Sequence, residues 1–288
     1  MADKRPDSPP SLLITGCSSG IGHAAAHTMQ SRGWRVLATA RQPADVQRLK
    51  QEGLEAFQID LADSRSIQAG VAELMTRTGG KLDALFNNAA YGQPGAVEDL
   101  SREVLRQQLE VNLLGTHELT ARVLPMMRAQ GHGRIVQNSS VLGFAALPYR
   151  GAYICSKFAL EGLTDTLRLE LDGSGIHVSL IQPGPINSRF RDNAYRAFKD
   201  NIDAVNSAHA STYQKVQARL AGADGGKTPF ALDPDAVVNR LIHALEHPRP
   251  KARYAVTLPT RLFSLLRRIL TSRGMDAVLL RSTRAERR

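Results

Sequence analysis

A tyrosine and a lysine four residues apart carry the most specific chemistry in this chain. Tyr153 and Lys157 lie in G-A-Y-I-C-S-K-F-A-L-E-G-L, whose pattern is helical, so both side chains are predicted to share one helix face. A free tyrosine has a pKa of about 10 and is a poor base near neutral pH. A nearby ammonium favours the phenolate and lowers that pKa. The pair indicates proton transfer, although the same spacing also arises by chance on surface helices.

A glycine-rich segment near the N-terminus has the composition of a phosphate-binding loop. The residues T-G-C-S-S-G-I-G run from Thr15 to Gly22, directly after an apolar run and before a helical pattern. Glycine lets the backbone approach a ligand closely, and the free N–H groups of a helix N-terminus favour an anion. The spacing G-x-x-x-G-x-G differs from the commoner G-x-G-x-x-G. We predict a phosphate site here, with a tight turn that binds nothing as the alternative.

The end of the second apolar run distinguishes between the two nicotinamide dinucleotides. NAD-binding proteins usually place an acid there to bind the ribose hydroxyls. This chain has Thr39-Ala40-Arg41 and no acid. A guanidinium pairs with a 2′-phosphate through charge-assisted hydrogen bonds, whereas a carboxylate would repel it. We therefore predict NADP(H) as the cofactor, and the alternative is that Arg41 is only a solvated surface charge.

Seven short runs of apolar and β-branched residues alternate with longer helical patterns. The runs are predicted strands that begin at Leu12, Trp34, Leu54, Leu82, Gly133, Ile176 and Arg253. Such alternation predicts a parallel sheet with right-handed crossovers and helices on both faces. A helix is expected at about 235–246, with Asp233-Pro234 as its cap and first turn. In this architecture, ligands bind at the carboxyl ends of the strands.

Further polar residues follow the predicted strands and carry a family resemblance. Asn87-Asn88-Ala89-Ala90 ends the fourth strand, Ser140 the fifth and Pro183-Gly184 the sixth, while Asn112 lies in the helix after the fourth. With T-G-x-x-x-G-I-G, N-N-A, N-x-x-G, S, Y-x-x-x-K and P-G in order, roughly residues 11–257 closely resemble the short-chain dehydrogenase/reductase family, especially its branch of 17β-hydroxysteroid and retinol dehydrogenases. The resemblance implies an α/β fold with a single Rossmann-type doubly wound sheet of about seven strands in the order 3-2-1-4-5-6-7.

The resemblance also implies an NADP(H)-dependent oxidoreductase that interconverts an alcohol and a ketone or aldehyde. Tyr153 would be the general acid in reduction and the base in oxidation, and Lys157 would lower its pKa and hold the nicotinamide ribose. Ser140 would orient the substrate oxygen, and Asn112 would hold a water that relays protons by way of Lys157. The residues implied to contact the cofactor are Gly16, Ser18, Ser19, Gly20, Ile21, Arg41, Asp60, Asn87, Ala89, Tyr153, Lys157, Pro183, Gly184, Ile186 and Ser188.

Two positions depart from the family pattern. The usual N-N-A-G is N-N-A-A here, with Ala90 in place of the glycine. The usual threonine after P-G is replaced by Ser188, which keeps the hydroxyl expected to bind the carboxamide. Neither departure falls on a predicted catalytic residue.

The predicted substrate pocket is mostly apolar. Its lining is expected to include Ser140, Leu142, Tyr149, Tyr153, Pro185 and Phe190. Phe190 belongs to residues 188–231, a polar stretch that is too long for an ordinary connection and is predicted to be a substrate lid. An apolar pocket favours a hydrophobic substrate such as a steroid, a retinoid or a long-chain carbonyl compound. Ordinary packing within the lid explains its aromatic residues equally well.

The other segments flank one catalytic domain, predicted to span residues 11–258. Residues 1–10 are polar and proline-rich and are expected to be a disordered lead-in. The formal net charge is +10, and from His247 onward eleven lysines and arginines accompany only two acids. Residues 259–288 are therefore predicted to be a basic tail, and the catalytic body is close to neutral.

The tail is predicted to contain an amphipathic helix. Its apolar residues are Leu262, Phe263, Leu265, Leu266, Ile269 and Leu270, assigned to one face, and Arg261, Ser264, Arg267 and Arg268 lie opposite. Such a helix suits a peripheral contact with an anionic membrane. We favour the alternative that its apolar face closes the substrate cleft or packs in a dimer interface. Nucleic-acid binding has no recognition motif to support it.

Composition bounds the remaining possibilities. Only two cysteines, Cys17 and Cys155, and no signal peptide fit a cytoplasmic protein. The eight histidines are interpreted as isolated, with no H-x-x-x-H pair or acidic cluster in a plausible site, so no metal is expected. The resemblance implies a homo-dimer or homo-tetramer through helices around 102–129 and 152–171. The alternatives from other classes are a catalytically silent NADP(H)-binding regulator and a membrane-associated interaction protein.

Overall fold

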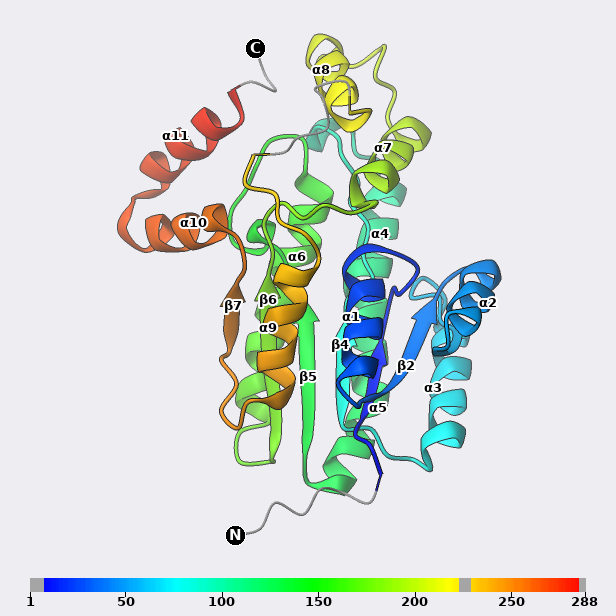
Figure 1. The fold of residues 1–288 in the computed structure, drawn as a ribbon. Coiled ribbons are helices and arrows are strands. Elements are labelled where there is room, and N and C mark those ends of the chain that lie inside the picture. Colours follow the sequence, from blue (N-terminus) through cyan, green and yellow to red (C-terminus); the bar gives the residue numbers. More distant parts are fainter. Residues whose placement is uncertain (1–7, 223–228, 285–288) are drawn as a thin grey trace.

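A seven-stranded parallel sheet forms the centre of the molecule. The computed structural model describes residues 8–222 and 229–284. The strands follow the order β3-β2-β1-β4-β5-β6-β7, and every neighbouring pair is parallel, which confirms the predicted sheet (Figure 1). Their bounds are Ser11–Ile14 for β1, Arg35–Ala40 for β2, Glu55–Gln58 for β3, Ala84–Asn87 for β4, Gly133–Asn138 for β5, Ile176–Gln182 for β6 and Arg253–Ala255 for β7. Residues 1–7 of the predicted lead-in lie outside the described part.

Helices cover both faces of the sheet. One face carries α1 (Gly20–Ser31), α2 (Pro43–Gln51) and α9 (Asp235–Glu246), and in Figure 1 α1 and α9 stand in front of the strands. The other face carries α3 (Ser64–Thr78), α4 (Arg102–Leu109), α5 (Gly115–Gln130) and α6 (Gly151–Glu170). The predicted bounds of α9 are confirmed, but its cap is not. Pro234 is the N-cap residue, and the Asp233 carboxylate accepts a hydrogen bond from the Asn187 side chain instead, at 2.8 Å.

Alternation of side chains along the strands builds two hydrophobic cores. In β1, Leu12 and Ile14 pack toward α1 and α9, whereas Leu13 packs toward α3 and α5. All three are fully buried. Because both faces of the sheet are covered, its central strands are continuously apolar rather than alternating. This burial makes the sheet a rigid base for the residues that follow its strands.

The predicted lid contains two helices and a small core of its own. α7 (Phe190–Asn201) and α8 (Ala210–Leu220) rise beyond the carboxyl ends of the strands (Figure 1). Phe198 and Tyr213 are buried between them, with ring centroids 5.1 Å apart. The Tyr213 hydroxyl also accepts a hydrogen bond from the Ala96 N–H at 2.8 Å and donates to Asp99. The segment is therefore anchored to the connection after β4. Residues 223–228 of the predicted lid lie outside the described part of the chain.

The C-terminal segment folds into two helices, α10 (Leu258–Ile269) and α11 (Ser272–Ser282). The six apolar residues assigned to one face of α10 divide between two sides. Phe263, Leu266 and Leu270 pack with α11 and with the segment after η3 (Val141–Gly143), whereas Leu262, Leu265 and Ile269 are exposed. Residues 285–288 lie outside the described part of the tail. Within the residues that are described, no helix is both long and apolar enough to cross a membrane.

Candidate active site

The glycine-rich loop packs against the end of β4 and opens toward the N-terminus of α1. Gly16 and Gly20 have φ angles of 72° and 58°, in the left-handed region that favours glycine. A Cβ on Gly16 would lie 2.8 Å from the Ala89 Cα, so no side chain fits on that side. The N-cap residue of α1, Ser19, makes no side-chain capping hydrogen bond, and the first turn contains no acid. The N–H groups of this turn are therefore well suited to bind an anion.

Three polar residues that we did not predict to be functional hold this loop in place. Thr15 Oγ1 accepts hydrogen bonds from the N–H groups of Asn88 and Ala89, at 2.9 and 3.0 Å. The Asn88 amide donates to the carbonyls of Thr15 and Gly16, and its Oδ1 accepts from Asn138 Nδ2 at 2.9 Å. The ends of β1, β4 and β5 are thereby joined. The second asparagine of N-N-A and the asparagine before the serine motif were the available signals in the sequence.

The structure brings Tyr153, Ser140 and Lys157 together. Tyr153 lies in the first turn of α6, Ser140 is the N-cap residue of η3, and a hydrogen bond links their hydroxyls. Burial raises the pKa of Tyr153 to about 12, and the hydrogen bond from Ser140 offsets only part of that effect. The pKa of Tyr153 is raised overall, because desolvation of the phenolate outweighs the hydrogen bond from Ser140. Tyr153 is a neutral acid at physiological pH.

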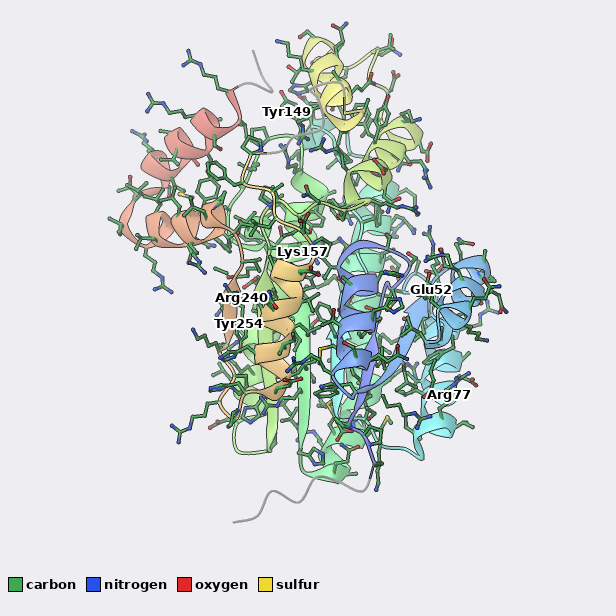
Figure 2. All side chains as sticks on the ribbon, viewed as in Figure 1. Glu52, Arg77, Tyr149, Lys157, Arg240 and Tyr254 are labelled. Atoms are coloured by element: carbon green, nitrogen blue, oxygen red, sulfur yellow. The ribbon has the colours of Figure 1, made fainter. Side chains whose placement is uncertain are left out.

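Lys157 is almost completely buried, with 2% of its surface exposed. Its Nζ donates to the Asn138 carbonyl at 2.7 Å and lies 5.7 Å from the centre of the Tyr153 ring. Burial lowers the pKa of Lys157 to about 8, and the Glu161 carboxylate one turn later raises it partly back. Figure 2 shows Lys157 near the carboxyl ends of the strands, below Tyr149. A buried amine with a pKa near neutrality is suited to proton transfer.

Asn112 occupies a short π-helix, Glu110–Leu114, which joins α4 directly to α5. Its side chain accepts from the Tyr91 N–H at 3.1 Å and donates to the Tyr91 carbonyl at 2.9 Å. It also donates to the Ser156 hydroxyl at 3.2 Å. Asn112 is therefore fixed between the end of β4 and Ser156 of α6, which precedes Lys157 in the chain. Such π-helical turns frequently occur at functional sites.

A cleft of about 430 Å³ beside the glycine loop is lined by three arginines. Its lining residues are Ser18, Ser19, Arg41, Gln42, Asp45, Arg189, Asp192, Asn193 and Arg196. In the described part of the chain, the guanidinium groups of Arg41, Arg189 and Arg196 have neither an ion pair nor a hydrogen bond. The three arginines thus remain available to an anion. Arg189 and Arg196 could not be found from the sequence, because their position depends on how α7 folds.

The other predicted residues surround this centre at the same edge of the sheet. Gly20 packs on Ser188, since a Cβ on Gly20 would lie 3.0 Å from the Ser188 Cβ. Asp60 follows β3, and its carboxylate accepts from the Ala62 N–H at 3.0 Å. The Asn87 side chain instead points into the protein and donates to Thr120 Oγ1 at 2.8 Å. Only the main chain of Asn87 is therefore in a position to contact a cofactor.

The predicted substrate-binding residues lie between α6 and the lid. The Phe190 ring contacts the Tyr153 ring edge-on, with centroids 5.4 Å apart. The Leu142 N–H donates to Ser140 Oγ at 3.1 Å, and Pro185 pairs through its carbonyl with the Leu232 N–H at 3.2 Å. Tyr149 has a φ of 61°, an uncommon conformation for a residue other than glycine, and its hydroxyl lies 3.3 Å from His209 Nδ1.

The comparisons with known proteins agree with this geometry. Residues 11–198 match the family model for the short chain dehydrogenase. The chain is 42% identical to the uncharacterized oxidoreductase YbbO of Escherichia coli, over 93% of both chains, and 34% identical to human 17-beta-hydroxysteroid dehydrogenase type 1, over 89% of this chain and 79% of that one. A short-chain dehydrogenase from Streptomyces avermitilis matches with a TM-score of 0.75 and 26% identity, over 97% of this chain and 99% of that one. The protein belongs to the short-chain dehydrogenase family and is an oxidoreductase of that family.

Proposed function

We propose that this protein is an NADP(H)-dependent oxidoreductase that interconverts a hydrophobic alcohol and its ketone or aldehyde. The observation that carries the proposal is the convergence of Ser140, Tyr153 and Lys157 beside the glycine loop, at the carboxyl ends of the central strands. A catalytically silent regulator on the same fold would not need this cluster. The comparison with human 17-beta-hydroxysteroid dehydrogenase type 1 supports the same class of reaction.

The roles of the residues follow from their contacts. When bound, NADP(H) supplies or accepts the hydride at the carbinol carbon. Ser140 and Tyr153 would bind the carbonyl oxygen between their hydroxyls, and the neutral Tyr153 would donate its proton to that oxygen as the alcohol forms. Lys157, with a pKa of about 8, would return a proton to the tyrosinate, and Asn112 would hold the water that connects this lysine to solvent. Because its pKa is raised, Tyr153 is protonated at neutral pH and holds the proton that carbonyl reduction consumes.

The residues around the glycine loop fit a dinucleotide. The first turn of α1 offers free N–H groups for the pyrophosphate, because Ser19 does not cap it with its side chain. Three buried polar atoms without a described protein partner lie where β5 ends, namely Gln137 Oε1, Asn138 Oδ1 and Ser139 Oγ. Such atoms usually have a ligand or water as partner. The unpaired Arg41, Arg189 and Arg196 support a 2′-phosphate, and hence NADP(H).

Parallel titrations with NADPH and NADH would test the cofactor. Tryptophan fluorescence or calorimetry should show much tighter binding of NADPH to the wild type, and Arg41→Asp should reduce or reverse this preference. Arg249→Ala is the matched control, because this exposed arginine lies before β7, at the opposite edge of the sheet, and should change neither affinity. Equal or tighter binding of NADH to the wild type would refute the assignment of Arg41.

The substrate pocket supports a hydrophobic substrate. Phe190 packs on Tyr153, and Leu142 and Pro185 flank the same region from η3 and from the connection after β6. We propose that residues 188–231 act as a lid within one catalytic domain of residues 11–258. A panel of steroid, retinoid and long-chain ketones, assayed for NADPH oxidation, would test the substrate class. Activity confined to small polar ketones would contradict it.

We further propose a homo-oligomer that forms through α5 and α6. Leu163 and Leu169 on α6 are exposed, with 45% and 73% of their surface accessible, although both are large apolar residues. α10 covers part of α6, where its Arg267 lies over Phe158 at 5.5 Å from the ring centre, and leaves Leu163 and Leu169 exposed. Sedimentation of the wild type and of Leu169→Arg would test the interface. The variant should dissociate, and a wild type that sediments as a monomer would exclude the proposal.

A second candidate function is a peripheral contact with anionic lipid through α10. Leu258, Leu262, Leu265 and Ile269 form an exposed apolar stripe on this helix, and Ile269 has 69% of its surface accessible. Arg261 and Arg268 are exposed beside the stripe. An apolar stripe flanked by arginines matches an anionic membrane surface in both hydrophobicity and charge.

Co-sedimentation with vesicles that contain phosphatidylserine would test the lipid contact. The wild type should pellet with these vesicles but not with neutral ones, and Leu265→Gln combined with Ile269→Gln should remain in the supernatant. Met75→Gln, at an exposed apolar residue on α3, outside the tail and the proposed interface, is the control. Equal pelleting of the stripe variant and the wild type would refute a lipid contact through α10.

A further inference from the structure

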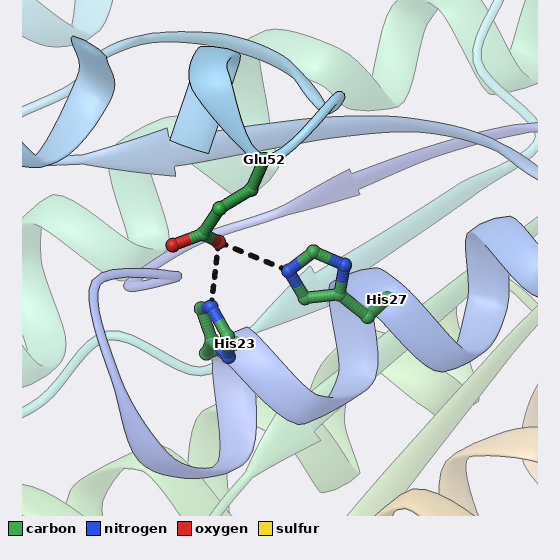
Figure 3. A group of neighbouring side chains, drawn as sticks. All are labelled: His23, His27 and Glu52. Atoms are coloured by element: carbon green, nitrogen blue, oxygen red, sulfur yellow. Dashed lines mark hydrogen bonds and ion pairs between the residues drawn. The ribbon is translucent and has the colours of Figure 1, made fainter. Parts of the chain in front are cut away.

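Two histidines and a glutamate converge at the joint between α1 and α2, away from the Tyr153 cluster (Figure 3). His23 and His27 lie one turn apart on α1, and Glu52 caps the C-terminal end of α2. Glu52 Oε2 lies 2.7 Å from His23 Nε2 and 3.0 Å from His27 Nε2. No H-x-x-x-H pair was expected in a plausible site, but His23 and His27 have this spacing and α2 brings a carboxylate to them.

The three side chains have the donor set and the positions of a metal-binding site. All three ligand atoms lie within 4.8 Å of one another. Zinc binds imidazole nitrogen and carboxylate oxygen at about 2.0–2.2 Å, so small side-chain rotations would place one ion between the three atoms. Two histidines and one carboxylate fill three positions of a tetrahedral site and leave the fourth for water. Each side chain is about one-third exposed, so an ion can enter from solvent.

Arg48 fixes the carboxylate in the orientation that such a site needs. Its Nη1 donates to Glu52 Oε1 at 2.9 Å, which leaves Oε2 directed at the two histidines. Its Nη2 donates to the Ser18 carbonyl at 2.6 Å and to Asp45 at 3.1 Å. Partners of this kind orient metal ligands and strengthen binding. Arg48 also connects the cluster to the glycine loop, because it binds both Glu52 and the Ser18 carbonyl.

A second H-x-x-x-H pair in the chain lacks this arrangement. His243 and His247 lie on and just after α9, and their rings stack with centroids 4.3 Å apart. Their Nδ1 atoms face the Tyr254 hydroxyl and the Arg249 carbonyl. In the part of the chain that the structure describes, only the His23 cluster groups three metal-ligating side chains. The second pair is thus a control with the same spacing and no carboxylate.

We propose that His23, His27 and Glu52 form a binding site for a divalent transition-metal cation of the zinc class, which joins α1 to the end of α2. In the absence of the ion, the hydrogen bonds from His23 and His27 to Glu52 hold the two helices together. The bound ion would replace the hydrogen bonds of Glu52 Oε2 by coordination and would strengthen the joint beside the glycine loop. Nothing in this proposal requires the ion for hydride or proton transfer.

Calorimetric titration of the full chain with zinc chloride tests the proposal. The titration is made in a Cys155→Ser background, because this exposed thiol is an alternative zinc ligand. We expect one ion per chain, binding at least tenfold more weakly in His27→Gln and in Glu52→Gln, and unchanged binding in His247→Gln. Lack of saturable binding, or wild-type binding in His27→Gln, would overturn the proposal, as would a loss of binding in His247→Gln.

Thermal unfolding with and without zinc supplies an independent readout. Zinc should raise the Tm of the parent protein and of His247→Gln but not that of His27→Gln, because only ligands that bind the folded state stabilise it. The substituted side chains are partly exposed, and a Tm without zinc close to that of the parent will confirm that each variant folds. NADPH titration of the same variants measures cofactor binding independently, so that a failure of the zinc site is distinguished from a failure of the cofactor assignment. An equal zinc-induced change in Tm for His27→Gln and the parent would place the ion elsewhere.

Discussion

Replacement of Lys157 by methionine should change how the stability of the protein depends on pH. Burial lowers the pKa of Lys157 from its ordinary 10.5 to about 8 in the folded state. Between these two values the unfolded chain holds a proton that the folded protein has released, so the free energy of unfolding rises with pH across this interval. At about 1.4 kcal/mol per pKa unit, the rise amounts to about 3 kcal/mol. Methionine keeps the bulk of the side chain but does not titrate, so Lys157→Met should lack this rise.

Urea unfolding of both proteins without cofactor, at pH values from 7 to 10.5, measures the effect. The informative quantity is the free energy of unfolding of the wild type minus that of Lys157→Met, because the other titrating groups cancel in this difference. The difference should increase with pH, mostly between about 8 and 10.5. The variant should also lose carbonyl reductase activity, because its side chain no longer supplies a proton.

A difference that stays constant from pH 7 to 10.5 would refute the reasoning. It would mean that the amine keeps its ordinary pKa, so that the hydrogen bond to the Asn138 carbonyl compensates fully for burial. A difference that falls with pH would mean that the folded protein raises the pKa of Lys157. In either case Lys157 could not serve as a proton donor tuned to physiological pH.

Three other predictions concern separate parts of the structure. Tyr153→Phe should lower kcat by about 10²–10⁴-fold but keep NADPH affinity, and unchanged turnover would exclude Tyr153 as the acid. Gly16→Ala should abolish NADPH binding, because residue 16 has a φ of 72° and the new Cβ would lie 2.8 Å from Ala89 Cα. Gly33→Ala is the control: it has a φ of 89° but no atom within 4 Å, so it should only lower the free energy of unfolding in urea, by about 1–2 kcal/mol. Phe198→Ala should destabilise the lid by about 3–5 kcal/mol and speed hydrogen exchange in α7 and α8; exchange at the wild-type rate would show that their small core does not hold them.

The sheet was predictable because its strands obey strong local constraints. Leu12, Leu13 and Ile14 form an apolar run directly before a glycine loop, and a strand buried on both faces has just this pattern. The bounds of α9, expected at about 235–246, were confirmed. The meeting of Ser140 with Tyr153 and Lys157 was implied by the family resemblance, because Ser140 follows β5 whereas the other two residues lie on α6.

Features that depend on tertiary packing were not predictable. Arg189 and Arg196 reach the cleft only because α7 folds over it, and no local pattern indicates this contact. The net rise in the pKa of Tyr153 was not predictable, since spacing reveals a neighbouring lysine but not the amount of water that burial removes. The apolar residues of α10 divide between a buried and an exposed side because α11 covers only one of them.

The π-helical turn around Asn112 has a consequence for how this chain can evolve. It inserts one extra residue between α4 and α5, and deletion of any residue from 110–114 would turn one helix relative to the other by about 100°. Gln108, before the turn, is buried and binds the main chain of Tyr91 and Gln93, while Leu119, after it, is buried in the core. One of these contacts would be lost with any such deletion. The length of the turn is therefore more constrained than its sequence, and the extra residue, once gained, is retained by the packing on either side of it.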